Sequence, residues 1–182
     1  MIKPVYRVIA AMLNVVLTLG LCGCQHAHSQ PPTQSFVATR PRPLGNGAYA
    51  VLREAATPQE ARVRDAAVIV YDRRTYSGAP ADEPLVYVAI DPGDYVPLVI
   101  EGSPVMRTNG QGKDILRVSL SRKYVQRTED FTRAHLGGRI AMVVDGQIVT
   151  LHKVRSVITD GHLQITRCTD KACKEIRAKL VE

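Results

Sequence analysis

The apolar run near the start of the chain decides how much of the sequence can fold into a domain. Val8 to Leu21 form 14 mostly apolar residues that follow Lys3 and Arg7. A membrane-spanning helix needs roughly 18–20 such residues, so this run is too short for a comfortable span and has the length of a signal-peptide core. We therefore expect residues 1–23 to be removed, which leaves enough chain for one domain and a linker.

The end of this run resembles the bacterial lipobox. Leu21-Cys22-Gly23-Cys24 places an aliphatic residue and two small residues before Cys24. The resemblance implies that Cys24 becomes the first residue and carries a covalent lipid, and we expect no other cofactor. Cys22 fits less well, because Leu21 would lie just before the cut. The alternatives are an ordinary cleaved signal with a free cysteine and an uncleaved anchor.

The residue after the cysteine bears on the location. An aspartate there would resemble an inner-membrane retention signal, and this chain has Gln25. We therefore expect a cell-envelope protein that is held by its lipid and faces the periplasm, at the outer membrane rather than the inner one.

Residues 24–47 are predicted to be a lipidated, disordered tether. They contain several prolines and Gly45-Asn46-Gly47, and they lack apolar periodicity. Fully stretched, the residues after Cys24 reach at most about 75–80 Å, so the domain can stand away from the bilayer. His26 and His28 could bind a metal ion, but two histidines in such a segment are more often incidental, and we predict no metal site.

The remaining residues, 48–182, are predicted to form the domain. Hydrophobic residues make up 45% of the chain and tryptophan is absent, so we expect an aliphatic core. Apolar runs rich in β-branched residues predict strands at 48–53, 67–71, 85–90, 95–100, 116–120, 140–144, 148–151, 154–158 and 162–166. Capping residues and three- and four-residue spacing predict helices that start at Thr57-Pro58, run from Arg122 to Leu136, and start again at Thr169.

Two patterns in the second half indicate the fold class. Ile140 to Val144 is an uninterrupted apolar run, which is typical of a strand that is buried on both faces. Asp145-Gly146 follows it and predicts a hairpin turn. The order of strand, helix, several strands and a last helix predicts an α+β domain, with a mostly antiparallel sheet and helices packed on one face.

The second half also resembles the periplasmic head domain of SecD, a large export-assisting membrane protein. The matching segments are Phe131–Gly137, Ile140–Val149 and Gly161–Thr166, followed by the helix from Thr169. The resemblance covers residues 115–180. It implies a SecD-head-like fold and contact with extended polypeptides.

The sequence departs from the SecD pattern at four positions. His135 stands where that family has asparagine, His152 where a proline is usual, and Leu163 and Arg167 where it has glycines. SecD also uses a membrane domain, with SecF, to couple proton flow to export, and we expect no membrane helix here beyond the signal. The resemblance therefore implies the fold but no motor.

Cys168 and Cys173 are predicted to form a disulfide. They lie at a strand end and in the first turn of the last helix, and the periplasm is oxidising. Across a turn, their Cα atoms could approach within the roughly 4.4–6.8 Å that a disulfide needs. The alternatives are a redox dithiol, a zinc site with His162, and two separate reduced cysteines.

No residue pattern predicts catalysis. Adjacent acidic residues are usually solvated and do not face each other across a cleft. A catalytic histidine needs a partner side chain, and a phosphate-binding loop needs a defined spacing of its glycines and lysine. The patterns that we considered and set aside are Asp82-Glu83, Ser103, Gly110–Lys113, Glu129-Asp130, His135, Asp145-Gly146 and His152.

The charge also excludes one class of partner. The formal net charge is +7, but the basic residues are scattered and lack interleaved aromatics. A nucleic-acid-binding surface would need clustering, so we expect no nucleic acid and only a mild preference for anionic partners such as phospholipid headgroups.

Together these observations predict a non-enzymatic, membrane-anchored envelope lipoprotein that binds a protein or extended polypeptide. The alternative is a passive structural subunit of an envelope complex, and a hydrolase is the least favoured class. The binding hypothesis rests on the resemblance alone.

Intact mass of the protein from membranes tests the two cysteine predictions. We expect loss of residues 1–23, the added mass of acyl groups on Cys24, and a gain of two hydrogens on reduction from Cys168 and Cys173. An unmodified, full-length chain would contradict the predicted location and, with it, the argument for a disulfide.

Overall fold

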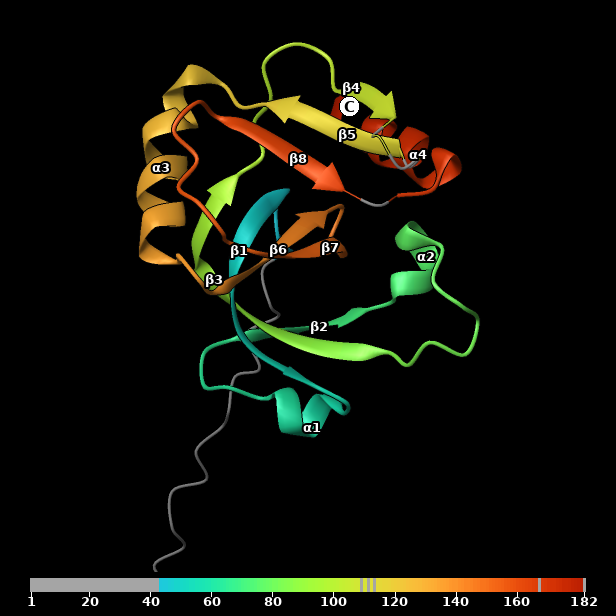
Figure 1. Cartoon of the computed structure of the whole chain (residues 1–182). Coiled ribbons are helices and arrows are strands. Elements are labelled where there is room, and N and C mark those ends of the chain that lie inside the picture. Colours follow the sequence, from blue (N-terminus) through green and yellow to red (C-terminus); the bar gives the residue numbers. More distant parts are fainter. Residues whose placement is uncertain (1–42, 109, 111, 113, 167, 182) are drawn as a thin grey trace, which may run out of the picture. The chain divides into compact units, whose positions relative to one another are not determined.

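A computed structural model of the chain describes residues 43–181, apart from 109, 111, 113 and 167 (Figure 1). The elements in chain order are β1 (Gly47–Ala55), α1 (Pro58–Ala61), β2 (Ala67–Tyr71), α2 (Arg73–Ser77), β3 (Val86–Pro97), β4 (Val105–Thr108), β5 (Asp114–Ser119), the 3-10 helix η1 (Arg122–Tyr124), α3 (Val125–Ala134), β6 (Arg139–Val144), β7 (Gln147–Lys153), β8 (His162–Thr166) and α4 (Asp170–Val181).

The strands form two antiparallel sheets. The larger has five strands in the order β2-β3-β1-β6-β7, and the smaller has three in the order β4-β5-β8. The α+β class and the antiparallel pairing that we predicted are confirmed. The strands form two sheets and not the single sheet that the sequence predicts, because strand patterns do not show which strands pair across the chain.

Strand β6 is buried on both of its faces, as its uninterrupted apolar run predicts. Successive side chains of a strand point to opposite faces. Ile140, Met142 and Val144 point into one hydrophobic core, while Ala141 and Val143 point into another. The five-stranded sheet therefore separates two cores.

The first core lies between the two sheets and also receives both long helices. It includes Leu116 of β5, Ile165 of β8, Phe131 of α3 and Ile176 of α4. Figure 1 shows α3 and α4 beside the three-stranded sheet. The second core lies against the other face of the five-stranded sheet and includes residues of β1, β2, β3, β6 and β7.

Both helix starts that depend on threonine are confirmed. The hydroxyl of Thr57 accepts a hydrogen bond from the backbone N–H of Glu60 at 3.3 Å and donates to the Glu60 carboxylate at 2.9 Å. The hydroxyl of Thr169 accepts from the N–H of Ala172 at 3.2 Å. These bonds satisfy N–H groups that have no partner within the helix.

The predicted strand at 154–158 is wrong. β7 ends at Lys153, and the segment that follows packs against the α3 region instead of pairing with a strand. The N–H of Val154 donates to the carbonyl of Gly138, and the N–H of Ile158 donates to the hydroxyl of Thr132. These bonds replace a β-ladder, so an apolar run alone did not indicate a strand.

The centre of the chain differs from the prediction in three further ways. The predicted strands at 85–90 and 95–100 are one strand, β3, which carries an irregular bulge between Ile90 and Tyr95. The turn-rich segment before it contains α2, and β4 was not predicted. In addition, α3 ends at Ala134, so Leu136 lies beyond the helical stripe and is 56% exposed.

The core is not purely aliphatic, because tyrosines enter both hydrophobic clusters. The ring of Tyr49 is buried and stacks on Tyr95, with ring centroids 4.8 Å apart and an interplanar angle of 8°. Its hydroxyl donates to the carbonyl of Gly45 at 2.9 Å, so burial leaves no polar atom of the phenol unpaired. Both rings lie against Gly47, where a Cβ atom would be 2.9 Å from Tyr49 Cε2 and from Tyr95 Cδ2.

We predict that Gly47→Ala lowers the free energy of unfolding by about 1–3 kcal/mol, the usual cost of overpacking a core. Gly45→Ala is the control, because no atom lies within 4 Å of its added Cβ. Urea unfolding followed by circular dichroism measures both variants. Equal stability of the two would contradict the close packing at Gly47.

Candidate functional site

The edges of the two sheets differ in how open they are. The edge strands of the five-stranded sheet, β2 and β7, lie close together. The edge strands of the three-stranded sheet are β4 and β8, and within the described residues no further strand pairs with either. An unpaired edge presents backbone N–H and C=O groups that can bind another strand.

The β8 edge is flanked at its start by the α3 region, and the β4 edge is not. A Cβ atom on Gly161, just before β8, would lie 2.8 Å from Val125 Cγ2. The chain leading to β8 also bonds Thr132 of α3 through the N–H of Ile158, at 3.0 Å. In Figure 1, β4 lies on the far side of β5 from β8. We therefore take β4 as the candidate edge.

The hydrogen bonds of β5 show which groups of β4 face outward. The carbonyl of Ser119 accepts from the N–H of Glu101 at 2.8 Å, whereas the N–H of Leu120 donates to Gly161 on the opposite side at 2.9 Å. Antiparallel ladders alternate in this way, so odd-numbered residues of β5 bond the β4 side. In β4, the residue opposite Ile115 is Arg107, so the backbone of Arg107 bonds to β5. Met106 and Thr108 lie on either side of Arg107, and their N–H groups therefore point away from the sheet.

One face of the three-stranded sheet is exposed. Even-numbered residues of β5 point into the core, so the odd-numbered residues and their cross-strand neighbours form the other face. We call this the outer face, and it includes Val99, Val105, Arg107, Ile115, Arg117 and Gln164. Val99 and Val105 are 46% and 49% exposed, so apolar and basic side chains lie together in the open.

Of the site residues predicted from the sequence, the two cysteines of the last helix region are joined. Cys168 and Cys173 form a disulfide with their Cα atoms 5.4 Å apart, and both side chains are buried. The bond links the start of α4 to the chain that leaves β8. Cys24, His26 and His28 lie outside the described residues.

The remaining candidate residues have structural partners. Asp145-Gly146 forms the predicted hairpin, and both residues have positive φ angles, of 52° and 70°. Asp145 accepts from Lys179 Nζ at 3.0 Å, and this hydrogen bond raises the pKa of Lys179. His135 Nε2 lies 2.7 Å from an oxygen of Asp94, in the β3 bulge. His152 lies half-buried on β7.

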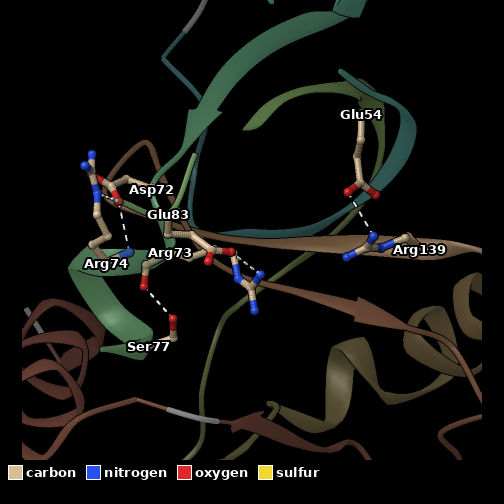
Figure 2. A network of polar contacts seen from close by, with 7 residues as sticks. All are labelled: Glu54, Asp72, Arg73, Arg74, Ser77, Glu83 and Arg139. Carbon is tan, nitrogen blue, oxygen red and sulfur yellow. Dashed lines mark hydrogen bonds and ion pairs between the residues drawn. The ribbon is translucent and has the colours of Figure 1, made fainter. Parts of the chain in front are cut away.

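Glu83, Glu129 and Asp130, from the two acid pairs, form ion pairs with arginines. Glu83 pairs with Arg73, and Glu129 pairs with Arg133 of the same helix. Figure 2 shows the first pair beside Asp72, which bonds both the backbone and the guanidinium of Arg74. The Arg74 hydrogen bond lowers the pKa of Asp72.

Two open hollows lie on the surface. One, of about 370 Å³, is lined by Asn46, Asp145, Glu175, Ala178 and Lys179. The other, of about 430 Å³, is lined by Leu136, Gly137, Lys153, Val154 and Arg155. Neither brings a nucleophile beside a base. Among the described residues, no three His, Cys, Asp or Glu side chains converge as metal ligands would.

The β4 edge and its neighbours on the outer face are functional candidates that the sequence patterns do not predict. No strand is predicted at Val105–Thr108. The alternation of Leu116 and Val118 with Arg117 did indicate a half-buried strand, and this was the only local sign that one face of this sheet is exposed.

Comparison with known families agrees with the resemblance found in the sequence. Residues 99–180 match the family model described as SecDF, P1 head subdomain. This confirms a SecD-head-like region, and the match begins before β4 and includes both α3 and α4. No curated protein matches the chain.

Two solved structures of SecDF are similar to this chain. The first is described as a membrane component that enhances protein export. It is 25% identical over 50% of this chain and 44% of its own, with a TM-score of 0.42. The second is SecDF in a super-membrane-facing form, with 16% identity, coverage of 76% and 28%, and a TM-score of 0.42. This chain thus spans less than half the length of either. Within the described part of the chain, no helix is both long and apolar enough to cross a membrane.

We predict that reduction of the Cys168–Cys173 bond lowers the free energy of unfolding by about 2 kcal/mol, because the bond closes a short loop in the unfolded chain. Chemical unfolding with and without dithiothreitol measures this loss. The double variant Cys168→Ser, Cys173→Ser is the control, and its stability should not respond to the reductant. Equal stability of the oxidised and reduced wild-type protein would contradict a stabilising bond.

Proposed function

We propose, from the match of residues 99–180 to the SecDF P1 head subdomain, that this protein binds extended polypeptide segments in the cell envelope. A solved SecDF is described as enhancing protein export, and we assign this chain an export-related role of the same general kind. The protein acts by binding and not by catalysis. It faces the periplasm and is held at the membrane, at the outer rather than the inner one, by a lipid on Cys24.

The open edge of β4 is the observation that carries the binding proposal. An extended segment can add to a sheet edge as a further strand, so that main-chain hydrogen bonds supply affinity for many sequences. The outward N–H groups of Met106 and Thr108, with their carbonyls, provide the bonds for such a segment. Val105 provides apolar contact on the outer face. Sequence-tolerant binding of this kind suits a protein that meets many secreted chains.

The tether supports the same function. Its expected length allows the domain to meet chains at some distance from the bilayer, whereas a rigid subunit of a complex would need no such reach. Binding would then be limited by the local concentration of unfolded segments and not by a fixed partner.

We predict that Thr108→Pro weakens the binding of an unfolded polypeptide at least about fivefold. Proline removes one outward N–H, and its ring obstructs the edge, without the loss of a backbone bond to β5. It also removes the exposed hydrogen bond of 3.0 Å from the Thr108 hydroxyl to Asp114. Gln164→Pro is the matched control, because it makes the same change at the outward side of β8. Fluorescence anisotropy of a labelled, reduced and carboxymethylated secreted polypeptide, titrated with the purified full-length chain, measures both variants.

Three results would overturn the proposal or its site. No saturable binding to the wild-type chain would overturn polypeptide binding. Capture of one stoichiometric envelope protein, without binding to unfolded chains, would identify the protein as a structural subunit. A loss with Gln164→Pro but not with Thr108→Pro would move the site to β8. Circular dichroism of each variant confirms that the fold is retained.

A further inference from the structure

Two arginines of the outer face have no ion-pair partner among the described residues. Arg107 lies on β4 and Arg117 on β5, and both are exposed. Some other arginines of this domain are paired, as Arg139 is with Glu54 at 2.9 Å (Figure 2). The register of the sheet places Arg107 and Arg117 on adjacent strands with a shift of two residues, because Arg117 is directly opposite Val105. Such diagonal neighbours on one face have Cβ atoms about 7 Å apart, so the two positive charges repel.

The acidic residues nearby do not relieve this repulsion. Asp114 points to the other face of the sheet, where it interacts electrostatically with Lys174 of α4. Glu101 belongs to the outer face but lies opposite Ser119, at the far end of the edge from Arg107. The part of the outer face nearest the open edge therefore carries only positive charge among the described residues.

An extended segment that pairs with β4 would place its side chains next to the positive charges of the outer face. A segment that pairs with β4 places its residues directly opposite Val105, Met106 and Arg107, with Cβ atoms about 4.5–5.5 Å apart. Side chains alternate along the added strand, so the residues facing Arg107 and Val105 are two apart and lie on the outer face. The residue between them faces Met106, at the rim of the core.

We propose that the β4 edge selects extended segments in which an acidic residue and an apolar residue are separated by one position. The acidic side chain would face Arg107 and lie diagonal to Arg117 of β5, and the apolar side chain would face Val105. This inference rests on the proposed polypeptide binding and adds its sequence preference. Opposite charges across neighbouring strands favour pairing, and like charges disfavour it, so the preference acts for acidic and against basic segments.

Peptide titration tests the preference. Two strand-forming peptides differ only in Glu or Lys at the position expected to face Arg107, with valine two residues away. We expect the full-length chain to bind the Glu peptide about fivefold more tightly than the Lys peptide at low salt, and the difference to shrink as salt is added. Arg107→Glu should reverse the order of the two peptides.

Arg155→Glu is the matched control, because it makes the same change in net charge at an exposed arginine outside the outer face, in the segment after β7. It should leave the ratio of the two affinities unchanged. A reversal by Arg107→Glu but not by Arg155→Glu would support a local contact rather than a long-range effect of charge.

The remaining outcomes separate this inference from the proposed function. Equal binding of both peptides to the wild-type chain, unchanged by Arg107→Glu, would overturn the preference and leave polypeptide binding intact. Failure of either peptide and of the unfolded polypeptide to bind would overturn both. If Arg107→Glu abolished binding to anionic vesicles and left the ratio of the two peptide affinities unchanged, the arginines would bind a membrane surface instead of a peptide. If it converted a dimer to a monomer, a second copy of the chain would cover the edge.

Discussion

The burial of β6 on both faces is the constraint on which the rest of the domain depends. A strand of alternating pattern could have closed one core and left its other face in water. Here Ile140 and Met142 contribute to the core that holds α3 and α4, while Ala141 and Val143 contribute to the core beneath β1 and β3. The two cores therefore share the five-stranded sheet, and β6 contributes side chains to both of them.

This arrangement also determines which edges of the domain remain open. The five-stranded sheet brings its own edges, β2 and β7, close together. The three-stranded sheet uses one face for the shared core and leaves the other face and β4 in water. Among the described residues, the sheet edges that remain open to a further strand thus belong to the smaller sheet.

The parts of the fold that could be predicted from sequence are those with a local cause. The Thr57 and Thr169 caps, the Asp145-Gly146 hairpin, the burial of β6 and the Cys168–Cys173 bond depend on residues that are close in the chain. The sequence resemblance to the SecD head also identified the region that the family comparison later matched.

The missed parts have non-local causes. β4 is a strand only because β5 pairs with it, and its four residues, Val105–Thr108, contain one side chain that packs on the core, so no alternation was visible. The segment after β7 is apolar because it covers α3, and that contact cannot be inferred from spacing. A sheet edge is open when no distant segment of the chain pairs with it, and a local sequence pattern does not show this.

The position of β1 has a mechanical consequence. This strand is bonded on one side to β3 and on the other to β6, and it is the first element after the expected tether. A pull transmitted through the residues before Gly47 would run along the strand, so it would load the hydrogen bonds to both neighbours in shear and at the same time. A strand at the sheet edge would instead lose its bonds to a single neighbour. Tension applied from the N-terminal side would therefore have to break both sets of hydrogen bonds together before β1 could leave the sheet.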